Sequence, residues 1–259
     1  MLPSLFISHG SPMLALEPSP AREFLAGLGA SLPRPQAIVI ASAHWDTPQP
    51  AVSAVATNDT IHDFYGFPAA LYAMHYPAPG APSLALRIET LLRDVGLTAD
   101  LDTTRGLDHG AWVPLSLMYP QRDIPVVQVS LQTERGPAHH LRLGKALAAL
   151  PREDVLVIGS GTFTHNLGRL RRGAPDAAPP PDIAAFADWM DAVLRQNRIE
   201  DLLAYRSKAP HAVTQHPTDE HLLPLFVALG AGGEDAGATR LHASTRYGTL
   251  RMDAYAFGA

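Results

Sequence analysis

The chain of 259 residues contains no cysteine. This absence excludes disulfides, thiolate metal ligands and a cysteine nucleophile, and it leaves the redox compartment undetermined. Charged side chains make up only 17% of the residues, the formal net charge is −5, and no basic stripe is interleaved with aromatic residues. A chain of this kind has no electrostatic footprint for nucleic acid, so we expect no nucleic-acid partner.

Long hydrophobic runs are also missing. No apolar stretch is long enough to cross a bilayer, and the N-terminus lacks a basic segment followed by an apolar run. We therefore expect no signal peptide, no membrane partner and a cytoplasmic location. No coiled-coil pattern or long exposed apolar stripe is present either, which favours a monomer or a weak homo-oligomer.

Three familiar catalytic motifs fail on inspection. The short zinc motif His-Glu-x-x-His does not occur. The segment Gly159-Ser160-Gly161 lacks the third glycine of a dinucleotide fingerprint, because position 164 is Thr164, and it does not fit the G-x-S-x-G pattern of a hydrolase elbow.

Three apolar runs, in contrast, each lead to a histidine. They are PSLFISHGSP at residues 3–12, AIVIASAH at 37–44 and VLVIGSGTFTH at 155–165, which deliver His9, His44 and His165. Continuous runs of this composition are typical of strands buried on both faces of a parallel sheet. Because ligands bind beyond the carboxyl ends of such strands, the repeated pattern predicts converging imidazoles and favours a transition-metal site.

The order of elements predicts an α/β fold. Strands alternate with helical patterns such as residues 82–95 and 136–150, and residues 238–257 alternate as in a terminal hairpin. We therefore expect one catalytic domain over residues 1–259, a single-domain α/β sandwich with a central, mostly parallel sheet, helices on both faces and a C-terminal β-hairpin. His139 and His140 are expected on a solvated helix face, and Glu220 and His221 at the start of a helix running to Leu229.

Five motifs in order along the chain resemble the class III extradiol ring-cleaving dioxygenases, and the nearest branch is similar to the DOPA extradiol dioxygenases. The motifs are FISHGSP (6–12), SAHW (42–45), GLDHGAW (106–112), GSG with THNL (159–161 and 164–167) and EHLLPL (220–225). The resemblance implies an enzyme that opens the ring of a catechol, DOPA-like or a related aromatic diol, with dioxygen to give a muconic semialdehyde.

The resemblance also implies the roles of individual residues. A single Fe(II), often replaced by Zn(II), would be held by His9, His44 and a third group from the 220 region, for which the branch motif favours His221. His165 corresponds to an acid/base histidine that could serve as a fourth ligand, and His109 to a second histidine that assists proton transfer. The loop residues His62, Asp63 and Tyr65 are expected to hold polar groups of the substrate.

Two other functions fit the histidines by themselves. A zinc-dependent hydrolase would use them to activate water, although the motifs contain no clear carboxylate base. A non-catalytic metal-binding protein would need only three ligands and would leave His109 and His165 without a role.

Overall fold

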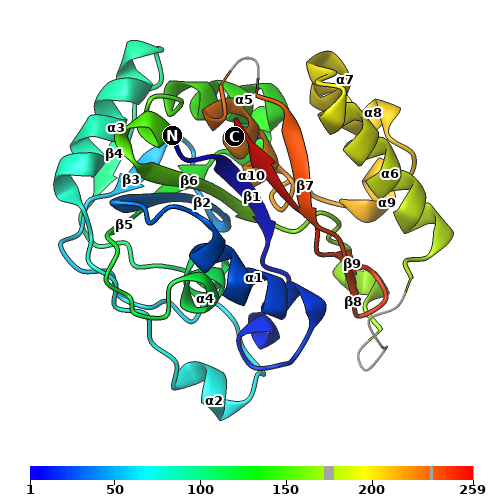
Figure 1. Ribbon diagram of the computed structural model, residues 1–259. Coiled ribbons are helices and arrows are strands. Elements are labelled where there is room, and N and C mark those ends of the chain that lie inside the picture. Colours follow the sequence, from blue (N-terminus) through cyan, green and yellow to red (C-terminus); the bar gives the residue numbers. More distant parts are fainter. Residues whose placement is uncertain (172–177, 234–235, 259) are drawn as a thin grey trace.

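A mixed sheet of eight strands forms the centre of the computed structural model, which describes residues 1–171, 178–233 and 236–258. The strand order is β4-β3-β5-β2-β6-β1-β10-β7 (Figure 1). These strands are β1 Ser4–Ser8, β2 Ala37–Asp46, β3 Ala51–Ser53, β4 Asp100–Asp102, β5 Val126–Leu131, β6 Val155–Gly161, β7 Ala238–His242 and β10 Ala254–Phe257. A separate antiparallel pair consists of β8 Thr245–Arg246 and β9 Leu250–Arg251.

Helices surround this sheet and confirm the expected single-domain α/β architecture. The α-helices are α1 Pro20–Ser31, α2 Ala69–Tyr72, α3 Pro82–Asp94, α4 His109–Met118, α5 Gly136–Ala146, α6 Pro181–Arg195, α7 Ile199–Leu203, α8 Tyr205–Lys208, α9 Ala212–Gln215 and α10 Leu223–Ala231. Short 3-10 turns are η1 Pro12–Ala15, η2 Thr133–Arg135, η3 Leu150–Glu153 and η4 Leu167–Arg169. Among the described residues, no helix combines the length and the apolar character needed to cross a membrane.

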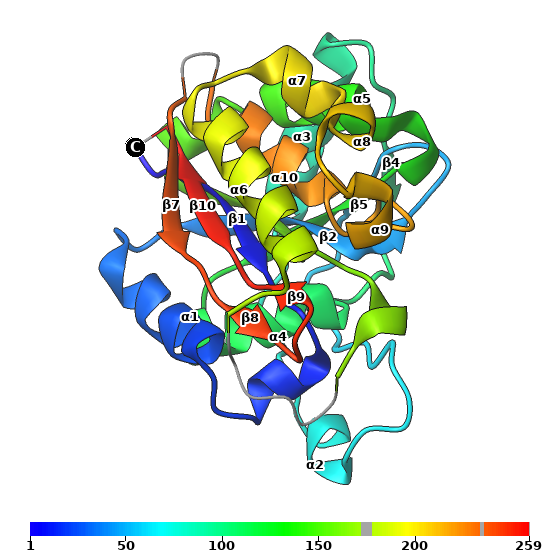
Figure 2. The same cartoon turned by 90° about the vertical axis from the view of Figure 1, so that its right-hand side faces the viewer.

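The central strands β5, β2, β6 and β1 run parallel to one another. β10 pairs antiparallel with β1 and then with β7, which makes β7 and β10 the predicted C-terminal hairpin. Since the carboxyl ends of parallel strands lie at one edge of the sheet, the segments that follow β1 and β6 meet there. In Figure 2 the arrowhead of β1 points towards α4 and the β8–β9 pair, which lie beside this edge.

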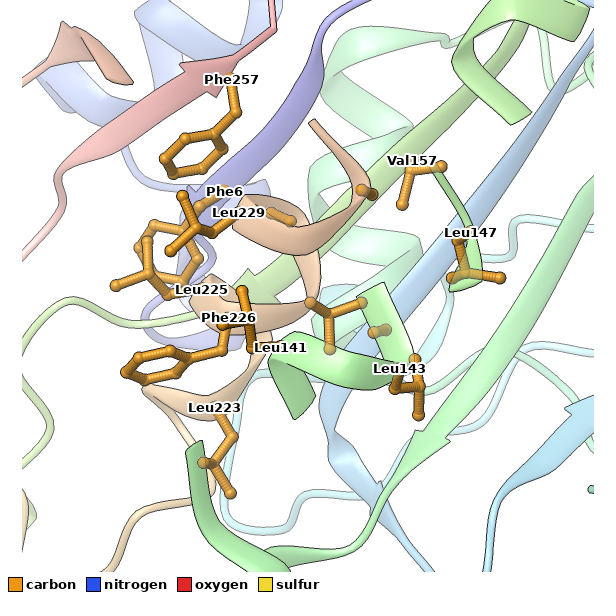
Figure 3. Close-up of a cluster of buried hydrophobic side chains, with 14 of the residues drawn as sticks. Phe6, Leu141, Leu143, Leu147, Val157, Leu223, Leu225, Phe226, Leu229 and Phe257 are labelled. Atoms are coloured by element: carbon orange, nitrogen blue, oxygen red, sulfur yellow. The ribbon is translucent and has the colours of Figure 1, made fainter. Parts of the chain in front are cut away.

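Both faces of the sheet are buried, because alternate residues of each strand point to opposite sides. One face packs against α3, α5, α6 and α10, and Figure 3 shows part of this core, in which Phe6 lies beside Leu225 and Leu229 of α10 and Val157 lies on the side of Leu147. The other face packs against α1 and α4. Its buried side chains include Leu5, Ile7, Ile38, Ile40, Leu156 and Ile158 from the strands and Leu25, Leu28, Trp112 and Leu115 from the helices.

Two local expectations were wrong. His140 is fully buried instead of solvated: its Nδ1–H donates to the Gly136 carbonyl (2.7 Å), and its Nε2 accepts from the Gln132 backbone N–H (3.1 Å). The neutral ring therefore has a partner at each nitrogen. Glu220 and His221 are not on a helix, because α10 begins only at Leu223, with Pro224 in its first turn.

Candidate metal centre

Three imidazoles from distant parts of the chain meet at the carboxyl edge of the sheet. His9 follows β1, and its backbone N–H continues the ladder by donating to the Gly161 carbonyl of β6 (2.8 Å). His44 lies inside β2, which continues to Asp46. His221 lies in the turn before α10. The Nε2 atom of His44 is 3.0 Å from Nε2 of His9 and 3.3 Å from Nε2 of His221.

Close backbone packing brings His221 to this edge. The His221 carbonyl accepts from the Thr162 backbone N–H (2.9 Å), just beyond the end of β6. A Cβ atom added at Gly161 would lie 2.1 Å from the same carbonyl oxygen. Only a glycine at this position lets the turn before α10 lie directly against β6.

Helix α4 approaches the three imidazoles from the other side. A Cβ atom at Gly110 would lie 2.4 Å from Ser42 Oγ, 2.9 Å from Cδ2 of His44 and 3.1 Å from Cε1 of His9. The buried carboxylate of Asp108, at the start of this helix, accepts from Ser42 Oγ (2.6 Å) and so ties α4 to β2. The first turn of α4 is thereby held against β2 and the segment that carries His9.

The second nitrogen of each ring has a partner that determines where its proton lies. Ser160 donates its hydroxyl hydrogen to the Gly110 carbonyl (2.5 Å), so it can only accept from Nδ1 of His9 (3.0 Å). Nδ1 of His221 faces the carboxylate of Glu220 (3.0 Å). Nδ1 of His44 faces the carboxylate of Asp63 at 3.5 Å. In each ring the proton therefore lies on Nδ1, and Nε2 carries a lone pair.

Three lone pairs that face one another need a cation between them. No proton can bridge all three nitrogens, and burial opposes protonation: it lowers the pKa of His44 to about 4 and, together with the neighbouring imidazoles, lowers the pKa values of His9 and His221 well below their usual range. Neutral imidazole nitrogens are ligands for zinc, iron and other transition metals. The donor set thus fits a metal ion, and the potential ligand atoms of His9, His44 and His221 all lie within 4.8 Å of one another.

A fourth imidazole, His165, stacks face to face on His221. The ring centroids are 3.4 Å apart and the planes differ by 11°. The His165 backbone N–H donates to the Gln215 carbonyl (2.9 Å), which holds the segment after β6 in place. Burial lowers the pKa of His165 to about 4, against the opposing effect of Glu220, so this imidazole is neutral at neutral pH.

A fifth imidazole, His109, lies beside His44, with ring centroids 3.9 Å apart. One carboxylate binds it twice: Asp63 accepts from the backbone N–H of His109 (2.9 Å) and from its Nδ1 (2.9 Å). Burial acts to raise the pKa of Asp63, but the hydrogen bonds from His109 outweigh this effect and lower the pKa to about 2. Asp63 is therefore ionised and accepts the hydrogen on Nδ1 of His109, so Nε2 is the ring nitrogen that points away from the carboxylate.

An aromatic segment forms one side of the site. Phe64 presents its edge to His109, with centroids 5.7 Å apart. His62 donates from Nε2 to the Met74 carbonyl (3.0 Å) and lies against Trp112. Tyr65 is 92% exposed. The three loop residues expected to meet the substrate thus lie in different surroundings. Asp63 is hydrogen-bonded to His109, His62 packs against Trp112, and Tyr65 faces solvent.

Two partners of the imidazoles were not among the predicted site residues. Ser160 lies in the segment Gly159-Ser160-Gly161, which failed as a dinucleotide or hydrolase motif and belonged to the motifs of the family resemblance, but Ser160 itself was given no role. Glu220 was expected either to support the metal ligands from behind or to act as a charge at a helix N-terminus, and its carboxylate lies 3.0 Å from Nδ1 of the neighbouring ring of His221. The adjacency of Glu220 and His221 was the only local signal for either contact.

One protein family and several known proteins match this chain over most of its length. The family described as the catalytic LigB subunit of aromatic ring-opening dioxygenase matches residues 3–258. A protein of Beta vulgaris named 4,5-DOPA dioxygenase extradiol is 46% identical over 260 residues, covering 98% of this chain and 96% of its own length. A protein of the same name from Escherichia coli K12 is 44% identical over 233 residues, covering 89% of this chain and 85% of its own length. A crystal structure of an uncharacterized Escherichia coli K12 protein superimposes with a TM-score of 0.83 at 35% identity and covers 100% of both chains.

Proposed function

Because this chain belongs to the LigB family of aromatic ring-opening dioxygenases, we propose that it opens the ring of a small catechol beside its two hydroxyl groups. The product is a muconic semialdehyde, and both atoms of dioxygen enter it, so no further oxidant or reductant is consumed. The names of the relatives support DOPA or a related aromatic diol as the substrate. The observation that carries the proposal is the convergence of three Nε2 lone pairs with two further imidazoles beside them.

We infer that the resident metal is Fe(II), held by His9, His44 and His221. When bound, a ferrous ion supplies the redox chemistry that lets a catechol react with dioxygen. Zn(II) would suit the same three nitrogens, but it has no accessible redox change and would leave the protein inactive. Since the imidazoles are neutral, they leave the charge of a divalent ion uncompensated, and a catechol that has lost both protons would neutralise it.

His165 is proposed to transfer protons and not to ligate the metal. An imidazole nitrogen directs its lone pair within the plane of its own ring. The plane of His165 is nearly parallel to that of His221 and displaced by the stacking distance. His165 and His221 therefore direct their lone pairs in two separate, nearly parallel planes, which would suit His221 as a metal ligand and His165 as a group beside it. As a neutral ring at neutral pH, His165 is ready to accept a proton from a catechol hydroxyl.

His109 is proposed as the second proton-transfer group. Its Nδ1 hydrogen is bound by Asp63, so only Nε2 is available to the substrate. That nitrogen accepts a hydrogen bond from a hydroxyl, and after protonation it donates one to a developing oxyanion, which the carboxylate behind it stabilises. Phe64 and its aromatic neighbours would pack against the ring of the catechol, and Tyr65 would contact polar groups at the mouth of the site.

Metal loading separates this function from the alternatives. The metal-free protein is loaded anaerobically with Fe(II) or with Zn(II), mixed with L-DOPA or another catechol, and exposed to air. We expect the iron form to consume one dioxygen per catechol and to produce a coloured semialdehyde, and the zinc form to do neither. An iron form that consumes no oxygen with any catechol tested would contradict the proposal.

A further inference from the structure

We propose that Asp63 is a positioning residue shared by two imidazoles, the metal ligand His44 and the proton-transfer group His109. The proposal rests on the roles assigned to these histidines in the preceding section. It replaces the expectation that Asp63 binds the substrate.

The two carboxylate oxygens of Asp63 have different partners. Oδ1 of Asp63 accepts from the backbone N–H of His109 (2.9 Å). Oδ2 accepts from Nδ1 of His109 (2.9 Å) and also faces Nδ1 of His44 at 3.5 Å. An ionised carboxylate has enough lone pairs for all three N–H groups and cannot donate to any of them. One side chain thus holds the Nδ1 hydrogen of His109 by a hydrogen bond, and its negative charge favours a hydrogen on the facing Nδ1 of His44, so that the Nε2 atoms of both rings point away from it.

This sharing distinguishes Asp63 from the partners of the other two ligands. Ser160 serves the ring of His9, and Glu220 serves the ring of His221. Neither has a hydrogen bond to the ring of His109 or His165 among the described residues. The site therefore holds two carboxylates with different ring partners: Glu220 is hydrogen-bonded to the ring of His221, whereas Asp63 is hydrogen-bonded to the ring of His109 and also faces the ring of His44.

The chain on either side of Asp63 is tied to the segment around the start of α4. The Ile61 backbone N–H donates to the Leu107 carbonyl (2.8 Å), and the Ile61 carbonyl accepts from Nε1 of Trp112 (3.0 Å). On the other side, Phe64 packs edge-on against His109. These contacts hold the carboxylate in place before any metal or substrate binds, so the two rings are oriented in advance.

Loss of the carboxylate should act on both rings. Removing a group that orients a metal-bound imidazole typically weakens metal affinity or activity by about 10- to 100-fold. Asp63→Asn keeps the size of the side chain but replaces one oxygen with an NH2 group, so it can satisfy either the backbone side or the ring side of the contact and not both. Asp63→Ala removes both.

The first test is spectroscopic and does not depend on turnover. In zinc-loaded protein labelled with ¹⁵N-histidine, hydrogen-bonded Nδ1–H groups give separate low-field proton resonances. We expect Asp63→Asn to shift or abolish the resonances of both His44 and His109 and to leave that of His221 in place. The matched control, Glu220→Gln, should change the resonance of His221 alone. An unchanged His44 resonance in Asp63→Asn would overturn the shared role.

The second test uses zinc affinity and turnover. By chelator competition, Asp63→Asn and Glu220→Gln should each bind Zn(II) about 10- to 100-fold more weakly. At saturating Fe(II), kcat should stay at least about 10-fold low in Asp63→Asn because His109 is still misplaced. Full recovery of kcat in Asp63→Asn would overturn the proposal. If the wild type turned over no catechol, the proposed function would fail, and the resonances and zinc affinities would still decide the role of Asp63.

Discussion

The imidazoles of His165 and His221 stack face to face, with centroids 3.4 Å apart and planes 11° from parallel. This contact places the proposed proton-transfer group against a proposed metal ligand, with the two ring planes nearly parallel. It supports the proposal that His9, His44 and His221 hold the metal and that His165 does not.

Replacing His165 with alanine should therefore separate metal binding from catalysis. We expect His165→Ala to keep close to the wild-type metal content, measured by elemental analysis, and to lose about 10²- to 10⁴-fold in kcat, the usual contribution of a general acid/base. His221→Ala, which removes a ligand, should lose the metal itself. Loss of metal from His165→Ala to the same extent would make His165 a fourth ligand.

Ser160 provides a second test, because its hydroxyl connects His9 to the Gly110 carbonyl. In Ser160→Ala both groups lose their partner, so the ring of His9 can turn. We expect metal affinity to fall about 10- to 100-fold by chelator competition. The control is Ser4→Ala, since this buried hydroxyl donates to the Ala228 carbonyl (2.6 Å), in a contact that involves none of the site histidines. In both variants the free energy of unfolding, measured with urea, should fall by about 1–3 kcal/mol. Only Ser160→Ala should also lose metal affinity, and a comparable loss in Ser4→Ala would contradict this role for Ser160.

Gly110 is predicted to tolerate no side chain. In Gly110→Ala the new Cβ would press on Ser42, His44 and His9, so the first turn of α4 and the two ligand rings must move apart. We expect loss of most metal binding and activity. Gly27→Ala in α1 is the matched control: nothing lies within 4 Å of its Cβ, and alanine in a helix interior should stabilise the protein by about 1 kcal/mol. Normal metal affinity in Gly110→Ala would contradict the prediction, because it would show that α4 can shift without displacing the rings of His44 and His9.

His140 should make folding stability depend on pH. Burial lowers the pKa of His140 to about 4, from an ordinary value of 6.5, so between these pH values the unfolded chain binds a proton that the folded chain does not. Stability must then fall as the pH drops from 6.5 to about 4, by up to about 1.4 kcal/mol per pH unit for this group. His140→Leu should show a correspondingly weaker pH dependence in urea unfolding of the metal-free protein. Parallel curves for variant and wild type would refute the assignment.

Part of this protein follows from local sequence. The apolar runs that form β1, β2 and β6 are continuous and rich in β-branched residues, so both buried faces and the parallel sheet could be predicted from them. The histidine at or near the end of each run is equally local information, as is the amphipathic helix α3, found at Pro82–Asp94 against the expected 82–95. Pro224 in the first turn of α10 was a local signal for a helix start at Leu223, and it was overlooked.

The orientation of the imidazoles was decided only by the tertiary structure. Which nitrogen of His9, His44 or His109 carries the proton depends on Ser160 and Asp63, which are close in space but distant along the chain. The burial of His140 likewise depends on whether both ring nitrogens find partners, which helical periodicity does not reveal. Sequence therefore determined that histidines gather at one edge of the sheet, and the packing of separate segments determined which lone pairs face one another, because a hydrogen-bond partner acts through distance in space and not through position in the chain.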